Sequence, residues 1–238
     1  MRLNYLVMII AKASLMVLVV TANSAQAADM KIKPFSGING QSPFASPVCL
    51  PASDSVSGVY GEEWCFGTTY LGGNMNAGTL YRVKPDGSKH KVLFNFDISH
   101  GLTPSQQPVA SPDRQHLYGV TSQGGRNGSG LIYDFNLLTN KINVLNSFAG
   151  PVGTTPQAPP IIVGNTLYGI TGQSGGNGFG TVWLQSIAGG PIQVMHSFAG
   201  GEADVATPFG ALTYNPGDGL LYGMAFSSGA NGLGGFSP

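Results

Sequence analysis

The sequence predicts an all-β protein: a β-propeller-like array of four-stranded antiparallel blades, with about 50 residues per repeat and an incomplete last blade. Three observations predict it. A short motif recurs about every fifty residues, which is typical of propellers and solenoids. Glycine makes up 36 of the 238 residues, and short apolar runs alternate with turn residues. No stretch after the first 27 residues has the periodicity of a helix.

The recurring motif contains a glycine that follows Leu-Tyr in three of its four copies. We interpret this motif as the second strand of each blade. The copies are spaced by 52, 50 and 54 residues, and the repeat glycines are Gly67, Gly119, Gly169 and Gly223.

The third repeat shows the predicted blade most clearly. A turn at Gly164-Asn165 separates its first two strands, because short loops that contain asparagine favour tight hairpins. The glycine-rich loop 172–180 suits neither a helix nor a central strand, so it joins the second strand to the third. The predicted strands are Pro160–Val163, Thr166–Thr171, Thr181–Leu184 and Ile192–Phe198. The second repeat gives 108–110, 117–121, 130–135 and 141–148, and the first gives 78–83 and 90–96 as its outer strands.

The chain divides into four predicted segments. Residues 1–27 form a signal peptide, because Arg2 precedes an apolar run that ends in the small residues Ala25-Gln26-Ala27. Residues 28–46 form an N-terminal segment, in which Met30 to Phe35 resembles a fourth strand and is a candidate closing strand. Residues 47–234 hold three full repeats and one partial repeat, and residues 235–238 are a truncated tail. We therefore expect a fragment of a longer array, since repeats need stacked neighbours.

Export and charge limit the partner classes. The apolar run Ala13 to Val20 is too short to span a bilayer, which takes about 20 residues. The mature chain therefore has no predicted membrane span. We expect it in the periplasm, at the cell surface or outside the cell. Without the leader, 9 Lys and Arg face 11 Asp and Glu, and no cation follows Lys141. Nucleic acid is therefore an unexpected partner, since phosphate binding needs clustered cations.

The two cysteines, Cys49 and Cys65, are predicted to form a structural disulfide. Aligning the repeats places Cys49 with Ala110 and Cys65 with Leu117, on consecutive strands of one blade. A reactive or metal-binding pair is disfavoured, because no histidine or third cysteine lies nearby.

Several segments resemble a known family. Residues 117–130 contain Leu-Tyr-Gly-Val-Thr, then Gly124-Gly125 and Gly128-Ser-Gly130, and residues 167–182 repeat this pattern. Together with Val-Met-His-Ser-Phe-Ala-Gly-Gly at 194–201, they resemble the bacterial tandem-repeat family nicknamed GloVer, over about residues 30–234. The first repeat departs from the pattern, with Cys65-Phe66 in place of Leu-Tyr. The resemblance implies an exported, propeller-like protein, often anchored at the cell surface, with no defined activity or catalytic residues.

Few residues are candidates for a site. The loop 61–63 is an insertion relative to the other repeats, so Glu62, Glu63 and Trp64 are the candidate binding residues. A glycosidase needs two carboxylates at a fixed separation, and Glu62 with Glu63, or Glu202 with Asp204, are the close acidic pairs. Acids in loops are solvated by default, so no catalytic residue is predicted. No metal or cofactor is predicted either, because the histidines are scattered and the glycine-rich loops contain no acid.

The recurring aromatic residues are expected to pack between blades rather than to form a sugar-stacking platform. They are Tyr118, Tyr168 and Tyr222 in the motif, and Trp183 at the position of Tyr81 and Tyr133 in the third strand.

Three functions stay open. The leading hypothesis is a non-enzymatic exported module that binds glycans or another surface protein. The alternative is a carbohydrate-active enzyme, a glycoside hydrolase or lyase, since propeller centres can gather acids from several blades. The third is a purely structural part of an anchored surface protein. The fold class alone does not choose among them.

Overall fold

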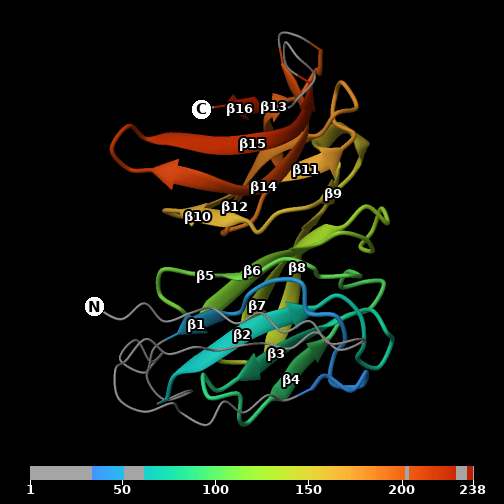
Figure 1. Ribbon diagram of the computed structural model, residues 1–238, viewed down its shortest axis with the longest axis vertical. Helices are drawn as coiled ribbons and strands as arrows, with labels where there is room; N and C mark the ends of the chain where they lie inside the picture. Colours follow the sequence, from blue (N-terminus) through green and yellow to red (C-terminus); the bar gives the residue numbers. More distant parts are fainter. Residues whose placement is uncertain (1–33, 51–61, 202–203, 229–234, 238) are drawn as a thin grey trace, which may run out of the picture.

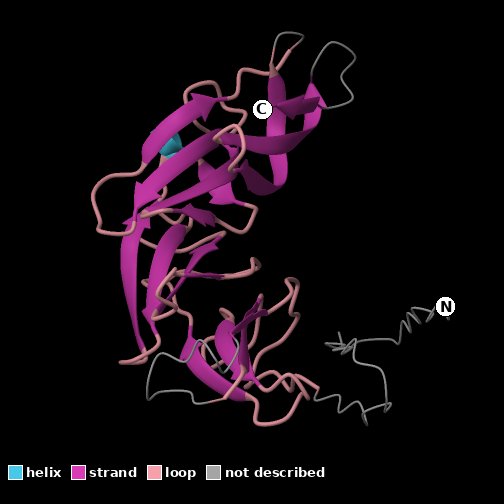
Figure 2. Ribbon diagram, turned by 90° about the vertical axis from the view of Figure 1, so that its left-hand side faces the viewer, coloured by secondary structure: helices cyan, strands magenta, loops and turns pink. Residues whose placement is uncertain are grey.

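The computed structural model describes residues 34–50, 62–201, 204–228 and 235–237. These residues form four antiparallel sheets that follow one another in sequence order along an arc (Figures 1 and 2). In the described ranges the one helix is a short 3-10 turn at Gly150–Val152. The all-β, propeller-like array predicted from the sequence is confirmed. The signal peptide and residues 30–33 of the candidate closing strand lie outside the described residues.

Within each sheet, strands that are consecutive in the chain pair with each other, except that β9 of the third sheet pairs with β11. The first sheet contains β1 (Val48–Leu50), β2 (Trp64–Thr69), β3 (Thr79–Val83) and β4 (Lys91–Asn95). The second contains β5 (Val109–Ala110), β6 (His116–Thr121), β7 (Leu131–Asn136) and β8 (Lys141–Ser147). The third contains β9 (Thr154–Pro156), β10 (Ile161–Val163), β11 (Thr166–Gln173), β12 (Thr181–Ser186) and β13 (Gln193–Ser197). The fourth contains β14 (Val205–Asn215), β15 (Leu220–Ser228) and β16 (Gly235–Ser237).

The repeat glycines are explained by the residues opposite them. In the first three sheets, each glycine of the second strand faces an aromatic residue of the third strand. The ring lies across the glycine: a Cβ added at Gly67 would approach the Tyr81 hydroxyl to 2.6 Å, and one at Gly169 would come under 3.0 Å from the Trp183 ring. Any larger residue would displace a fully buried ring. The close approach of a neighbour is the physical reason for glycine here.

The apolar core lies between neighbouring sheets. One cluster joins the first sheet to the second, and it includes Phe66, Leu80 and Tyr133. A second cluster joins the second sheet to the third, and it includes Tyr118 and Trp183. The third cluster, between the third and fourth sheets, is much smaller, and its buried residues are Ala158, Ile170 and Leu212.

A repeated aromatic contact connects successive repeats. Phe96, just after β4, meets Tyr133 of β7 edge to face, with ring centroids 5.3 Å apart and planes at 61°. Phe148, after β8, meets Trp183 of β12 at 5.4 Å and 65°. Phe35 meets Tyr81 of β3 in the same way, at 5.2 Å and 66°. Phe35 therefore occupies the place of a residue that ends a fourth strand, in line with the sequence comparison.

The connections between repeats share a strained backbone position before a proline. In four of these connections, the residue before the proline has a positive φ of 54° to 57°. Such a φ is costly for a β-branched side chain, and three of the four residues are threonines. The prolines that follow the three threonines lie against a glycine of the preceding sheet: Pro104 against Gly78, Pro156 against Gly130 and Pro208 against Gly180. No sequence pattern indicated this conformation. The four residues are Ser42, Thr103, Thr155 and Thr207.

The structure corrects one predicted boundary. Residues 235–238 were expected to be a tail beyond the array, but Gly235–Ser237 form β16, which pairs with β15. Ser237 lies opposite Gly223, the same register in which Trp183 lies opposite Gly169. The backbone ladder places this strand, so it forms without the β-branched residues that would have predicted it.

Candidate functional site

The three candidate binding residues of the first sheet differ in their exposure to solvent. Glu62 and Glu63 are exposed, and Glu62 forms ion pairs with Lys84 and Lys89. The hydrogen bond and charge of Lys84, followed by the charge of Lys89, lower the pKa of Glu62. Trp64 is only 7% exposed and belongs to the core between the first two sheets.

The indole of Trp64 is already covered by cations. The guanidinium carbon of Arg82 lies 4.3 Å from its ring centroid, and the Lys84 Nζ lies 4.4 Å from it. The ring is therefore largely covered within the protein, whereas the sequence predicted an exposed contact at Trp64. A binding role for Glu62 and Glu63 stays a prediction.

The predicted disulfide between Cys49 and Cys65 is confirmed. The two residues face each other across β1 and β2, with their Cα atoms 3.9 Å apart. Ala110 and Leu117 face each other at the matching place in the second sheet. The repeat alignment thus located the bridge correctly.

Three of the four histidines pair with an aspartate, a feature that sequence spacing did not reveal. His100 binds Asp97 within one turn at 2.9 Å. The His116 Nδ1 lies 2.6 Å from the Asp134 Oδ1, across the β6–β7 hairpin. The remaining pair is His196 with Asp204. Among the described residues, no group of three or more His, Cys, Asp or Glu side chains is arranged to hold a metal ion.

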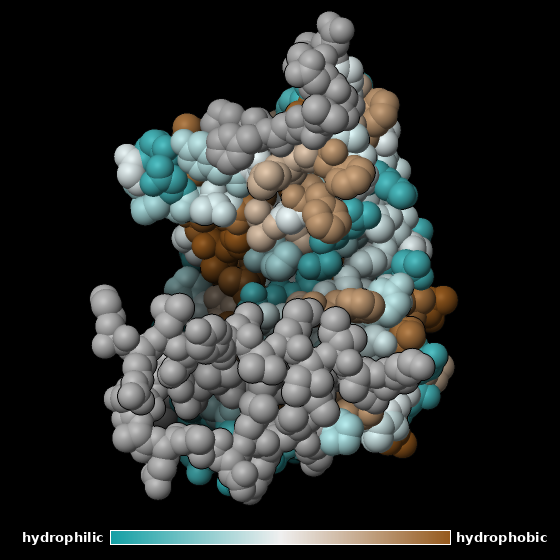
Figure 3. Space-filling model, in the orientation of Figure 1, coloured by the Kyte–Doolittle hydropathy of each residue, from teal (hydrophilic) through white to brown (hydrophobic). Residues whose placement is uncertain are grey.

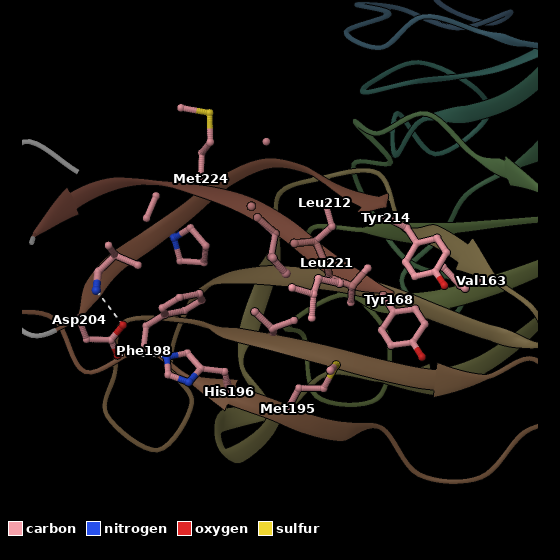
Figure 4. Close-up of a pocket in the computed structure, with 18 of the residues that line it drawn as sticks. Val163, Tyr168, Met195, His196, Phe198, Asp204, Leu212, Tyr214, Leu221 and Met224 are labelled. Carbon is pink, nitrogen blue, oxygen red and sulfur yellow. Dashed lines mark hydrogen bonds and ion pairs between the residues drawn. The ribbon is translucent and has the colours of Figure 1, made fainter. Parts of the chain in front are cut away.

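A cavity lies between the third and fourth sheets, and we call it the inter-sheet pocket. Its volume is about 450 Å³. One wall comes from β10 to β13 and the other from β14 and β15, and most of the side chains are apolar (Figure 4). His196, Phe198 and Asp204 lie at one end, and Tyr168 and Tyr214 lie together at the other (Figure 4).

The polar end of the inter-sheet pocket is a hydrogen-bonded histidine–aspartate pair. The His196 Nε2 lies 3.1 Å from the Asp204 Oδ2, and Asp204 also accepts hydrogen bonds from the backbone N–H groups of Ala199 and Val205. Desolvation alone would raise the pKa of Asp204, but these three donors outweigh it and lower the pKa. Asp204 therefore carries a negative charge at neutral pH. Its predicted acidic partner, Glu202, lies outside the described residues.

The recurring tyrosines differ in their packing. Tyr118 is buried between the second and third sheets, as expected. Tyr168 is half-buried and lines the inter-sheet pocket. Tyr222 donates its hydroxyl to the Asp218 carboxylate at 2.6 Å. Trp183 is fully buried, which confirms its predicted packing role.

The fourth sheet also carries exposed apolar side chains. Phe226 is 77% exposed, Met224 is 66% exposed and Phe209, opposite Met224 in the sheet, is 60% exposed. Figure 3 shows apolar surface in this part of the molecule, beside the turn that joins β14 to β15. Contiguous apolar surface of this kind is typical of an interaction region.

The family model of the Gloeobacter/Verrucomicrobia repeat matches residues 63–236, which include all four copies of the glycine motif. The chain belongs to this repeat family. The resemblance noted in the sequence is thereby confirmed. No curated protein sequence matches this Gloeobacter/Verrucomicrobia repeat protein.

Several solved structures are similar to the repeat protein. A protein of unknown function from Bacteroides thetaiotaomicron VPI-5482 has a TM-score of 0.51 and 10% identity, over 82% of this chain and 43% of that one. A chain of a nidogen/laminin complex has a TM-score of 0.49 and 16% identity, over 68% and 51%. TolB from Acinetobacter baumannii has a TM-score of 0.44 and 17% identity, over 87% and 44%.

These similarities concern the fold alone. The matched region spans about half, or less, of each of these three chains. In the described part of the repeat protein, no helix is long and apolar enough to cross a membrane.

Proposed function

We propose that this repeat protein is an exported, non-catalytic binding module whose ligand enters the inter-sheet pocket. The observation that carries the proposal is the pocket itself. Its volume of about 450 Å³ falls in the range of known ligand sites. Its walls are mostly apolar, and the hydrogen-bonded pair of His196 and Asp204 lies at one end. A few placed polar groups on an apolar surface are the usual composition of a ligand site.

The lining favours binding over glycoside chemistry. A glycosidase needs two carboxyl groups on opposite sides of a sugar ring. Among the described lining residues, Asp204 is the one carboxylate, and its hydrogen bonds hold it ionised and engaged. Neither Glu62 nor Glu63 lines this pocket.

The lining also favours one predicted partner class. The hydroxyl groups of a glycan need polar partners when they are buried, and this pocket has few. An apolar group, such as a side chain of a surface protein, fits it better. The disulfide Cys49–Cys65 supports export, because such bonds persist in oxidising compartments.

Binding of the neutral, apolar dye Nile red to the purified chain tests the proposal. Ala225 lines the pocket, so Ala225→Phe should fill part of it and weaken dye binding several-fold. Ala188→Phe is the matched control, since Ala188 is exposed and lies away from the lining. Equal dye binding by the wild type and both variants, all folded, would contradict a ligand site here.

A further inference from the structure

The two closed interfaces show what usually fills the space between sheets. Tyr133 of β7 fills the interface between the first and second sheets, and Trp183 of β12 fills the next one. Both rings are fully buried. Each is held edge-on by the phenylalanine that follows the fourth strand of the preceding sheet, and each lies across the repeat glycine of its own sheet.

The walls of the inter-sheet pocket match the surroundings of Trp183 position by position. The repeat register defines the correspondence, for example Gly169 with Gly223 and Phe148 with Phe198. The residues clustered around Trp183 are Tyr118, Val120, Ile132, Phe148 and Leu167, with Gly169 beneath the ring. Their counterparts, Tyr168, Ile170, Val182, Phe198, Leu221 and Gly223, all line the inter-sheet pocket.

The aromatic residue itself has no counterpart in the fourth sheet. The position opposite Gly223 is occupied by Ser237, where the earlier sheets carry Tyr81, Tyr133 and Trp183. Serine has no ring, so the phenylalanine and the glycine that accommodate a ring are both present without one. Phe198 and Gly223 both line the inter-sheet pocket instead.

Resting on the proposed function, we propose that the inter-sheet pocket binds a neutral aromatic ring of the indole or phenol type. The ring takes the place that Trp183 and Tyr133 take in the closed interfaces, with its edge or face against Phe198. Edge-to-face contact between rings adds to the stabilisation from buried apolar area, which favours an aromatic ring over an aliphatic one.

Charge and hydrogen bonding limit the ligand further. The Trp183 Nε1 and the Tyr133 hydroxyl have no hydrogen-bond partner in the described parts of the chain, so the equivalent sites select a ring by packing. The negative charge of Asp204 at one end of the pocket disfavours an anionic ligand. A neutral ring satisfies both conditions.

Binding of indole and methylcyclohexane to the purified full chain, followed by ligand-observed NMR, tests this inference. Indole should bind about fivefold more tightly than methylcyclohexane, since an aromatic pair adds a modest preference. N-Acetyl-tryptophanamide identifies the source of the ring: its binding indicates a side chain of a partner protein, and its exclusion indicates a free small molecule. Equal binding of indole and methylcyclohexane overturns the aromatic preference but leaves the binding function in place.

Two variants locate the ring. Ser237→Trp supplies the indole from the chain itself, so it should weaken indole binding at least tenfold, on a scale set by the competition for one site, and should raise the Tm. Ser99→Trp is the matched control, because Ser99 is exposed in a turn that follows β4, away from the pocket lining. Unchanged indole binding in folded Ser237→Trp overturns the proposal. If Ser237→Trp does not fold, Phe198→Leu provides the test. It should weaken the affinity for indole several-fold and leave the affinity for methylcyclohexane unchanged. An unchanged affinity for indole overturns the proposal.

Discussion

The interface between the second and third sheets and the interface between the third and fourth are built from the same repeat positions, yet only the first is filled. Trp183 is fully buried in one, and the pocket of about 450 Å³ lies in the other. At the repeat glycine the two cases differ in the residue opposite: Trp183 faces Gly169, while Ser237 faces Gly223. Corresponding positions of a repeat architecture can therefore line a packed interface in one place and a cavity in another.

The largest expected contrast concerns that residue. Trp183→Ala should lower the free energy of unfolding by about 3–5 kcal/mol, because it removes a fully buried ring and leaves a cavity. Ser237→Ala, at the same register position, should change it by less than about 0.5 kcal/mol. Urea denaturation of both variants measures the difference. Similar losses in the two variants would mean that the two interfaces are packed alike.

The next largest contrast comes from replacing a repeat glycine by alanine in each of the two interfaces. Gly169→Ala should cost about 1–3 kcal/mol, because the new Cβ would overlap the buried ring of Trp183. Gly223→Ala should cost less than about 0.5 kcal/mol, since its Cβ would lie 2.9 Å from the end of the flexible Leu212 side chain, beside the pocket. Thermal unfolding of the two variants measures these costs. A larger effect at Gly223 would contradict an open interface between the third and fourth sheets.

The residue that follows each repeat glycine sharpens the comparison further. Val120 is buried between the second and third sheets, whereas Met224 at the same position of the fourth sheet is 66% exposed. Val120→Ala should cost about 1.5 kcal/mol through the loss of two buried carbons. Met224→Ala should have almost no effect on unfolding, and equal costs would show that a partner covers Met224 in solution.

The smallest expected effect is dependent on pH. The folded protein holds the pKa of Asp204 below its usual value of 3.8, so the contribution of this group to stability is present above that pH and is lost as the pH falls through the lower, folded-state value. Asp204→Asn should therefore cost less than about 1 kcal/mol at pH 7 and less still below pH 3.8. Denaturation curves at pH 7 and pH 3 test the sign. A cost that grows on acidification would contradict it.

Much of the fold was predictable because the repeat fixes its own register. The motif glycines, the strand order and the pairing of Cys49 with Cys65 all follow from aligning the copies. β16 was missed because Gly235-Phe236-Ser237 has little strand propensity, and its pairing comes from the neighbouring backbone.

The candidate site was less accessible from the sequence. Trp64 follows an acidic loop, so it looked exposed, but Arg82 and Lys84 from the adjacent strand cover its ring. Contacts between residues of neighbouring strands cannot be predicted from their order in the sequence alone. The pocket did leave a signal: aligning Tyr81, Tyr133 and Trp183 with Ser237 would have shown a missing ring. That alignment requires a third strand in the fourth sheet, which the sequence did not indicate.

The edge-to-face contacts also bear on how such an array can grow. The first and second repeats each carry a ring that contacts the preceding phenylalanine and a phenylalanine that contacts the ring of the next repeat: Tyr81 with Phe96, and Tyr133 with Phe148. A duplicated gene segment encoding one repeat would therefore encode both sides of the new junction. Gene duplication could lengthen the protein without any compensating mutation at the new junction.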